Sequence, residues 1–201
     1  MNKKEIALLL GFVFTVAFSL CCESISAAEN IKANTLRLHV IANSDTVQDR
    51  DIKLAVKDEI LKMENLLPDT AADYSTALET VNRNTAEIAD RINTCLAQWN
   101  VPYKAECTVE RFYFDTTEYD SFALPQGEYT ALTVRLGRAQ GKNWWCVVYP
   151  ALCSQSCGKI VLENSDEFIK TDGITARFKV VEIYEDIKGY FAQRADRYEH
   201  L

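Results

Sequence analysis

A thiol and an imidazole are the side chains in this sequence that could act as a nucleophile and its base. Cys146 could attack a substrate, His39 could take the thiol proton, and Asp45 could orient the imidazole. Cys146 lies in the segment Trp-Trp-Cys-Val-Val-Tyr, where a thiol is typical of a small core residue. His39 alternates with Leu38 and Val40, which indicates a residue on a sheet face. We therefore expect both side chains to be structural and the protein not to be an enzyme.

A second possible chemistry is metal binding by cysteine. Cys146, Cys153 and Cys157 are separated by six and then three residues, a spacing that no common zinc site shows. We expect no metal and no other cofactor. An odd number of cysteines lies beyond the N-terminal segment, so at least one is free or bonded between chains. Four cysteines are interpreted as disulfide-bonded or buried thiols: Cys95, Cys107, Cys146 and Cys153.

The loop between two predicted strands contains glycines and a lysine, as a phosphate-binding loop does. That motif has four residues between its glycines, then Lys and Ser or Thr, and it leads into a helix. Here Gly137 and Gly141 enclose three residues, and Asn143 follows Lys142 where a hydroxyl residue is needed. We interpret the segment as a hairpin turn and expect no small-molecule substrate.

Paired carboxylates could hydrolyse a wall glycan by acid–base catalysis. Acidic residues are frequent, among them Asp45, Asp49, Asp51, Glu110 and Glu128, but no spacing selects two of them. Most are typical of solvated helix faces or caps. An exported envelope hydrolase that acts on wall material is therefore the alternative function.

Trp144 and Trp145 are consecutive in a predicted strand and must point to opposite faces of the sheet. One can enter the core, and the other is either covered by a helix or exposed to a partner. Exposed aromatic side chains often dominate the energy of an interface. The sequence leaves both possibilities open.

The first elements that position these side chains are a strand and two helices. Residues 35–42 alternate as a strand, and residues 43–45 (Asn43, Ser44 and Asp45) end it and can cap the next helix. Apolar residues from Ile52 to Leu67 predict a helix that Pro68 closes. A second helix opens around Thr76 and Glu79, which have capping-box spacing, and its apolar stripe extends to Trp99.

From Tyr103 the apolar period changes to two. Strands are expected from Tyr103 to Tyr113, with these two residues and Cys107 on one face, and again over 128–136 and 144–149. Helical spacing returns over about 173–196, with Asp172 placed to cap that helix. The order of strand, two helices, three strands and helix predicts a single α+β domain, with helices packed on a mostly antiparallel sheet.

The N-terminus predicts export. Lys3 and Lys4 precede an apolar run over 6–20, which fits a signal peptide and is short for a membrane span. Small residues, Ser26 and Ala28, permit a cut after Ala28. We expect residues 1–28 to be a signal peptide, with a retained membrane anchor as the alternative, and residues 29–201 to form one domain.

Composition excludes some partners. The 201 residues include 22 Lys and Arg against 29 Asp and Glu, which gives a net charge of −7. This acidic excess argues against unspecific nucleic-acid binding and against electrostatic binding to anionic lipid, since both need clustered basic residues. The proportions are otherwise those of an ordinary globular domain.

Two segments are distinctive when taken together. The first is Arg37-Leu38-His39-Val40-Ile41-Ala42-Asn43-Ser44-Asp45. The second comprises Pro125-Gln126-Gly127-Glu128-Tyr129-Thr130-Ala131-Leu132, Gly141-Lys142-Asn143-Trp144-Trp145-Cys146-Val147 and Tyr149-Pro150-Ala151-Leu152-Cys153. Over roughly residues 35–153 the chain resembles the stage II sporulation protein R family of endospore-forming bacteria.

The resemblance implies a secreted signalling protein with no catalytic residues. Such proteins are made in the forespore and exported into the space between the two sporulation membranes, where an uncleaved signal would leave them tethered. There they trigger a membrane-embedded aspartic protease of the mother cell, which cleaves the precursor of an early sigma factor.

We hypothesise that residues 37–45 and 125–146 form one continuous patch that binds the extracytoplasmic part of the protease. Polar groups at strand ends are where a rigid scaffold presents binding residues. The alternative is structural, with residues 43–45 as helix caps and Glu128 paired across the sheet. The residues assigned to the patch are Arg37, His39, Asn43, Ser44, Asp45, Gly127, Glu128, Tyr129, Asn143, Trp144 and Trp145.

Overall fold

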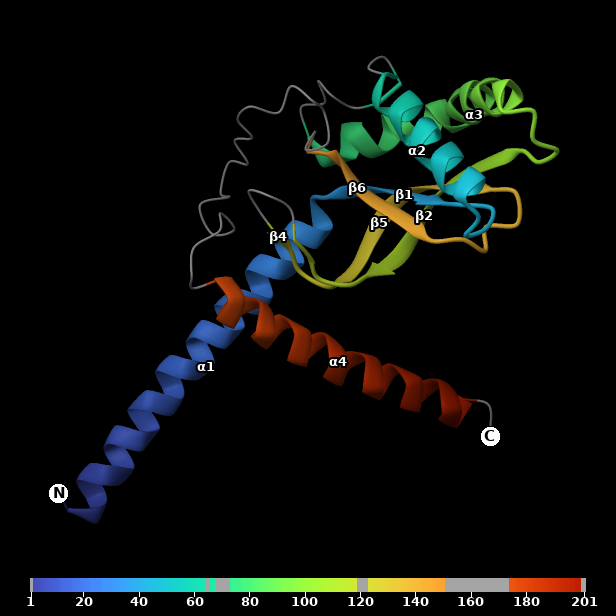
Figure 1. Cartoon of the computed structure of the whole chain (residues 1–201). Coiled ribbons are helices and arrows are strands. Elements are labelled where there is room, and N and C mark those ends of the chain that lie inside the picture. Colours follow the sequence, from blue (N-terminus) through green and yellow to red (C-terminus); the bar gives the residue numbers. More distant parts are fainter. Residues whose placement is uncertain (1, 64–65, 68–72, 119–122, 151–173, 200–201) are drawn as a thin grey trace. The chain divides into compact units, whose positions relative to one another are not determined.

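The computed structural model describes residues 2–63, 66–67, 73–118, 123–150 and 174–199, with the helical backbone alone over 174–178 and 192–199. The elements are α1 (Lys3–Ala33), β1 (Leu36–Ile41), α2 (Val47–Leu61), α3 (Tyr74–Gln98), β2 (Ala105–Phe114), β3 (Thr117–Glu118), β4 (Ala123–Leu124), β5 (Gly127–Leu136), β6 (Asn143–Tyr149) and α4 (Ile174–Glu199) (Figure 1). The α+β class is confirmed. The expected signal-peptide boundary and the single domain over 29–201 stay predictions.

The chain divides into two compact units, which we describe separately. The sheet unit comprises Asn34–Phe112 and Glu128–Glu163. The helical unit comprises Met1–Ala33, Tyr113–Gly127 and Asn164–Leu201.

The four-stranded sheet has the strand order β2-β5-β1-β6. β1 is parallel to β5, with Leu36 opposite Thr130 and Ile41 opposite Arg135, and antiparallel to β6. The strands β2 and β5 are antiparallel. Glu110 pairs with Arg135 near the end of β5, whereas the later residue Arg111 pairs with Glu128 near the start of β5. The sheet is therefore mixed. The expected antiparallel arrangement holds except for the central pair β1–β5, whose long connection permits the parallel direction.

The hydrophobic core lies between one face of the sheet and the helices α2 and α3 (Figure 1). Alternate residues of β1, namely Leu36, Leu38 and Val40, are fully buried there. They pack with Ile52 and Val56 of α2 and with residues of α3 in the same cluster. The strict alternation along β1 thus sends every second side chain to the opposite face of the sheet.

The boundaries of α2 differ from those expected. Its N-cap is Thr46, whose hydroxyl accepts a hydrogen bond from the Asp49 backbone N–H, so residues 43–45 do not cap it. The helix ends at Leu61 rather than at Pro68. The Leu67 backbone N–H then bonds to the Met63 carbonyl in a turn, so the late apolar residues of the stripe are buried without being helical.

α3 begins earlier than its capping-box pattern predicts. Asp73 is the N-cap, and its carboxylate accepts a hydrogen bond from the Thr76 backbone N–H at 2.8 Å. Thr76 and Glu79 are therefore inside the helix. The predicted apolar stripe is confirmed at its centre, where Val81, Ile88 and Ile92 are fully buried.

β2 confirms the expected period at its start and departs from it at its end. Ala105 is buried, and Cys107 and Val109 pack against the core, as predicted. Tyr113, expected on the same face, is exposed, whereas its neighbour Phe114 is buried. These last two residues of the strand belong to the helical unit.

In the helical unit, α4 confirms the expected C-terminal helix, while its predicted cap Asp172 lies outside the described residues. α1 continues without interruption past Ala28. Among the described residues, α1 is the one helix long and apolar enough to cross a membrane, with a mean hydropathy of 2.2 in its most apolar window. This helix is compatible with a signal peptide or a membrane anchor.

Candidate functional site

One edge of the sheet unit gathers the ends of several strands. Because β1 and β5 are parallel, their carboxyl ends lie side by side, next to the start of β6. Binding sites of sheets with parallel strands commonly lie at this edge. We call the residues that meet here the strand-end cluster: Asn43, Ser44, Asp45, Val47, Asp49, Tyr103 and the loop residues 137–143.

The Asp49 carboxylate is the centre of the strand-end cluster. Tyr103 donates its hydroxyl to one carboxylate oxygen at 2.6 Å, and the Asn43 amide donates to the other at 2.9 Å. Ser44 also donates its hydroxyl to that second oxygen. Burial alone would raise the pKa of Asp49, but these hydrogen bonds outweigh it and lower the pKa below its usual range. Asp49 is therefore a fixed anion at neutral pH.

Burial and the bond to Asp49 also raise the pKa of the Tyr103 hydroxyl, which remains a donor at neutral pH. Sequence reasoning did not find Asp49 or Tyr103. A signal for Asp49 existed, because Thr46 and Asp49 have the spacing of a helix N-terminus in which a hydroxyl residue precedes an acidic one by three.

The loop 137–143 is fastened to residues 42–45 by its backbone. The Asn43 side-chain oxygen accepts from the Arg138 N–H at 3.0 Å, and the Asp45 carboxylate accepts from the Lys142 N–H at 2.7 Å. The Gly141 N–H donates to the Ala42 carbonyl at 2.9 Å. Asn43 and Asp45 therefore hold a crossing loop in place rather than capping a helix.

The hairpin interpretation of this loop is wrong. β5 and β6 are not neighbours, because β1 lies between them, so the loop crosses the carboxyl end of β1. This crossing requires small residues. Gly137 has a φ of 57°, and a Cβ on Gly141 would collide with the Ser44 carbonyl. The loop leads into a strand, as expected, and so lacks the helix of a phosphate-binding loop.

The side chains of the strand-end cluster differ in exposure. Asp45, Arg138, Lys142 and Asn143 are exposed, and Val47 beside them is 65% exposed. Lys53 lies below the loop and donates its ammonium group to the Lys142 carbonyl at 2.9 Å. The cluster therefore presents charged groups of both signs and one apolar side chain on a rigid base.

The face of the sheet opposite the helices carries four other predicted residues. His39 is fully buried, with its ring 3.8 Å from that of Trp145 and 4.5 Å from that of Phe112 between centroids. Burial lowers the pKa of His39 to about 4, so it is neutral at pH 7. Arg37 is also buried, with its guanidinium 5.0 Å from the centre of the Tyr129 ring.

The geometry rules out the nucleophile–base pair of Cys146 and His39. Cys146 is opposite Leu38 in the register and belongs to the hydrophobic core, whereas His39 projects from the other face. Cys146 is also disulfide-bonded and carries no thiol. Trp144 shares the core side and lies 5.6 Å below the Lys57 ammonium, while Trp145 packs on His39.

Two further described cysteines lie in the sheet unit, and neither is activated as a nucleophile. Cys95 and Cys107 are free thiols, and burial raises both pKa values, that of Cys107 to about 12. The predictions for Cys153 and Cys157 fall outside the described residues. Within the described part of the chain, no group of His, Cys, Asp or Glu could hold a metal ion.

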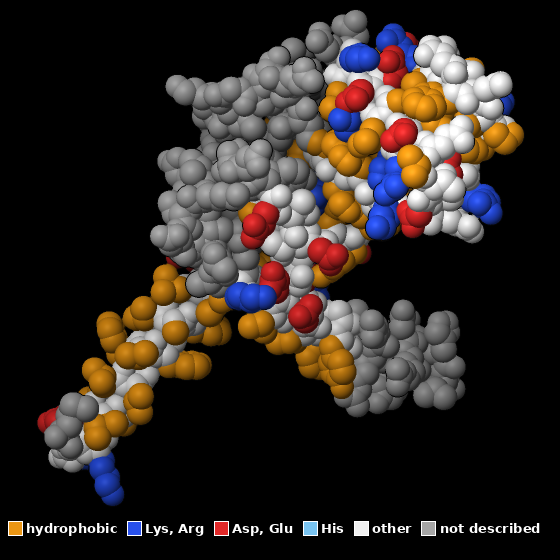
Figure 2. Space-filling model, viewed as in Figure 1, with side chains coloured by type: hydrophobic (Ala, Val, Ile, Leu, Met, Phe, Trp, Pro, Cys, Tyr) orange, Lys and Arg blue, Asp and Glu red, His pale blue; other side chains and the backbone are white. Residues whose placement is uncertain are grey.

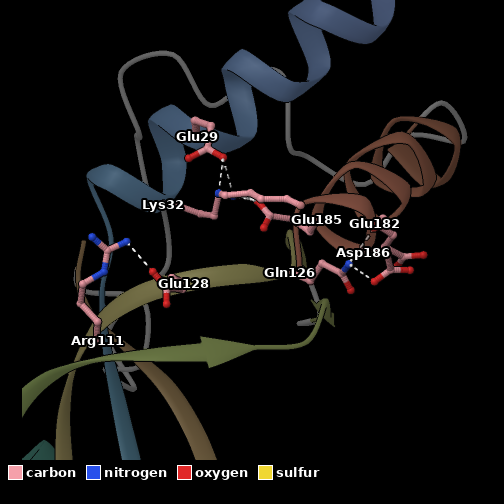
Figure 3. A network of polar contacts seen from close by, with 9 residues as sticks. Glu29, Lys32, Arg111, Gln126, Glu128, Glu182, Glu185 and Asp186 are labelled. Carbon is pink, nitrogen blue, oxygen red and sulfur yellow. Dashed lines mark hydrogen bonds and ion pairs between the residues drawn. The ribbon is translucent and has the colours of Figure 1, made fainter. Parts of the chain in front are cut away.

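Two predicted patch residues lie at the other end of β5. Glu128 is exposed and pairs with Arg111 at 2.8 Å (Figure 3). Gly127 has a φ of 142° in the helical unit, where a Cβ would meet the Lys32 side chain. The structure thus brings together Asn43, Ser44, Asp45 and Asn143 but places Glu128 at the opposite end of its strand. The binding role of these residues stays a prediction.

Comparison with known proteins agrees with the distinctive segments of the sequence. The family described as Stage II sporulation protein R matches residues 32–159, which include the strand-end cluster. The Stage II sporulation protein R of Bacillus subtilis (strain 168) is 28% identical over 139 residues. That alignment covers 68% of this chain and 62% of the relative, so the chain spans less than two thirds of the relative's length. No solved structure matches.

Proposed function

The chain belongs to the stage II sporulation protein R family, and we therefore propose that it is a secreted sporulation signal that activates a membrane-embedded aspartic protease. The protease in turn cleaves the precursor of an early mother-cell sigma factor. The chain acts in the space between the forespore and mother-cell membranes. The observation that carries this proposal is the family match over residues 32–159.

The strand-end cluster is the surface best suited to contact the protease. It lies within the matched region, and its backbone is fixed by the hydrogen bonds that N–H groups of the crossing loop donate to the Asn43 and Asp45 side chains. A rigid surface loses little conformational entropy when it binds. Its exposed residues, Asp45, Val47, Arg138 and Lys142, offer charged groups around an apolar contact.

An activator of this kind needs no chemistry of its own. It must bind the active state of the protease more tightly than the inactive state, and a difference of about 3 kcal/mol shifts that equilibrium more than a hundredfold. The described residues are compatible with such a role, because Cys146 is bonded and His39 is buried and neutral. Activity therefore depends on surface residues that a catalytic mechanism would not use.

The test is to co-express the exported chain with the membrane protease and the sigma-factor precursor in a host that does not sporulate. Precursor cleavage on an immunoblot is expected only when the chain is present and exported. The double variant Arg138→Glu with Lys142→Glu should reduce cleavage by at least roughly tenfold, since it reverses two charges at the interface.

The matched control is Arg83→Glu with Arg91→Glu, which reverses two exposed charges on α3, away from the strand-end cluster. It should leave cleavage unchanged. If the exported, folded chain does not cause cleavage at all, the activator role is wrong. If the strand-end and control variants behave alike, the role survives but the contact surface lies elsewhere.

A further inference from the structure

α4 has an apolar face whose large side chains are more than half exposed. Ile183, Ile187, Tyr190 and Phe191 are 58%, 52%, 58% and 63% exposed. Their spacing places them on one side of the helix. The opposite side carries Val181 and Glu185, which are buried. α4 is thus attached by one face and presents large apolar side chains on the other.

The attached face of α4 packs on the C-terminal part of α1. The Lys32 ammonium of α1 pairs with Glu185 of α4 and, at 2.9 Å, with Glu29 (Figure 3). Both Lys32 and Glu185 are buried, and Ala28 is buried one helical turn before Lys32. This contact fixes α4 relative to α1 within the helical unit.

The N-terminal part of α1 is exposed and apolar. No charged residue occurs from Ile6 to Cys22, and large apolar side chains along this run, such as Phe12 and Phe14, are more than half exposed. Such a surface requires a membrane or a protein around it. In Figure 2 the apolar side chains of α4 lie on the side toward which this run extends.

α4 contacts α1 at the position where a membrane surface is expected to lie if α1 crosses the membrane. The contact with α4 is centred between Ala28 and Lys32, about eight residues after Cys22, which corresponds to about 12 Å along a helix. The near face of α4 is about 5 Å closer, given the radius of a helix with side chains. It therefore falls within the headgroup layer, roughly 5–7 Å thick, of a bilayer that surrounds the uncharged run. Figure 1 shows α4 running across α1 rather than along it.

We propose that α4 is an interfacial helix that lies on the same membrane into which α1 inserts, with Ile183, Ile187, Tyr190 and Phe191 in the lipid headgroup region. This goes beyond the signalling role and does not depend on it, but it requires that α1 is retained as a membrane anchor, the alternative to a cleaved signal peptide. Tyr190 suits such a position, because tyrosine rings are enriched at both interfaces of a membrane.

The attachment is apolar rather than electrostatic. α4 contains equal numbers of basic and acidic residues, and the whole chain has a net charge of −7, so neither attracts anionic lipid. Binding should therefore occur on uncharged lipid and persist when salt is raised from about 0.1 M to about 1 M.

The experiment places a tryptophan at position 191, by Phe191→Trp, in the full chain reconstituted into phosphatidylcholine vesicles. Emission is compared between ordinary lipid and lipid brominated on its acyl chains, which quenches tryptophan at close range. The unsubstituted chain gives the background of the native tryptophans. We expect the added emission to lose roughly half its intensity or more in brominated lipid, since interfacial helices lie at the acyl boundary.

The control is Arg83→Trp, which places a tryptophan on an exposed site of α3. Brominated lipid should not quench the emission of this tryptophan. Adding Ile183→Glu with Ile187→Glu to the position-191 variant should remove most of the quenching while the chain still floats with the vesicles through α1. Quenching equal at positions 191 and 83 would overturn the proposal. If the emission of the tryptophan at position 191 is not quenched by brominated lipid but changes with protein concentration, a second copy of the chain covers α4 and the proposal is wrong.

Discussion

At the scale of single residues, the Asp49 carboxylate organises the strand-end cluster. Its three side-chain donors come from the loop after β1 and from Tyr103 before β2. An ionised carboxylate makes stronger hydrogen bonds than a neutral one. The alignment of the loop therefore depends on the charge of one buried side chain.

Tyr103→Phe should lower the free energy of unfolding by about 1.5–3 kcal/mol at pH 7, the usual contribution of a hydrogen bond to a charged group. Because the pKa of Asp49 is depressed in the folded state, its stabilising contribution is present above the unfolded pKa near 3.8 and is lost as pH falls through the lower folded value. The difference between Tyr103→Phe and the unsubstituted chain should therefore shrink below about pH 4.

Urea denaturation of both proteins at pH 7 and near pH 3 measures this difference. The matched control is Tyr113→Phe, which removes a hydroxyl from an exposed tyrosine and should change stability little. A penalty for Tyr103→Phe that is the same at both pH values would show that the Asp49 charge is not the reason.

The sequence offered two roles for Asn43, Ser44 and Asp45. Partner binding stays a prediction, whereas helix capping is wrong, because Thr46 caps α2. All three end β1 as expected, and their side chains then bind the Asp49 carboxylate or the loop backbone. Capping is a local interaction that a sequence pattern can predict. The bond between Asp45 and Lys142 joins residues far apart in the chain, and local patterns carry no information about it.

At the scale of elements, the loop 137–143 crosses the end of β1 so closely that it does not tolerate a larger residue at the crossing point. Gly141 contacts the Ser44 backbone so closely that any Cβ would displace one of the two segments. Gly189, in the middle of α4, has no atom within 4 Å of the position of a Cβ. A side chain should therefore be excluded at position 141 and tolerated at position 189.

Gly141→Ala should destabilise the protein by about 1–3 kcal/mol, the usual cost of forcing a methyl group into a packed site. Gly189→Ala should be neutral or should stabilise by up to about 1 kcal/mol, since alanine is a better helix former. Thermal unfolding of both variants measures the contrast. A harmless Gly141→Ala would mean that the loop does not approach β1 as closely as described.

The period of apolar residues predicted every helix and strand of the sheet unit, because one face of each element is buried in a single core. It did not predict the strand order. The hairpin between β5 and β6 was the simplest arrangement of neighbouring strands, yet β1 lies between them. Pairing of distant strands depends on how whole elements fit together, which periodicity within each element does not encode.

At the scale of the whole molecule, the chain combines a strongly apolar N-terminal helix with two compact units. The composition predicted an ordinary globular protein and its N-terminus predicted export. Neither indicated that the helical unit brings together segments from both ends of the chain. Joining α1 to α4 depends on a buried ion pair, which no sequence pattern identified.

Lys32→Met should loosen α4, because Glu185 would be left buried with Lys188, at 3.7 Å, as its one cation among the described residues. Breaking a buried pair costs about 3–5 kcal/mol, and Lys188 should reduce that figure. Limited chymotrypsin digestion of the full chain in detergent should cut after Tyr190 or Phe191 faster in this variant.

Two further variants separate loss of the pair from loss of the lysine. Lys32→Met with Glu185→Leu should restore resistance, since an apolar pair often replaces a buried ion pair without loss. Lys179→Met breaks an exposed pair with Glu182 and should have no effect. If all three variants digest at one rate, the Lys32–Glu185 contact does not hold α4.

The place of β1 in the sheet also determines when the protein can fold. β1 is made early, yet both of its neighbours, β5 and β6, lie beyond residue 126. A nascent chain emerges from the ribosome N-terminus first, so β1 must wait, with both edges unpaired, until most of the polypeptide has been synthesised. Sheets built from such distant pairs form slowly, and their waiting strands are prone to aggregation. A slow start to folding would also suit the export that we propose, because a chain crosses a membrane more easily while it is still extended.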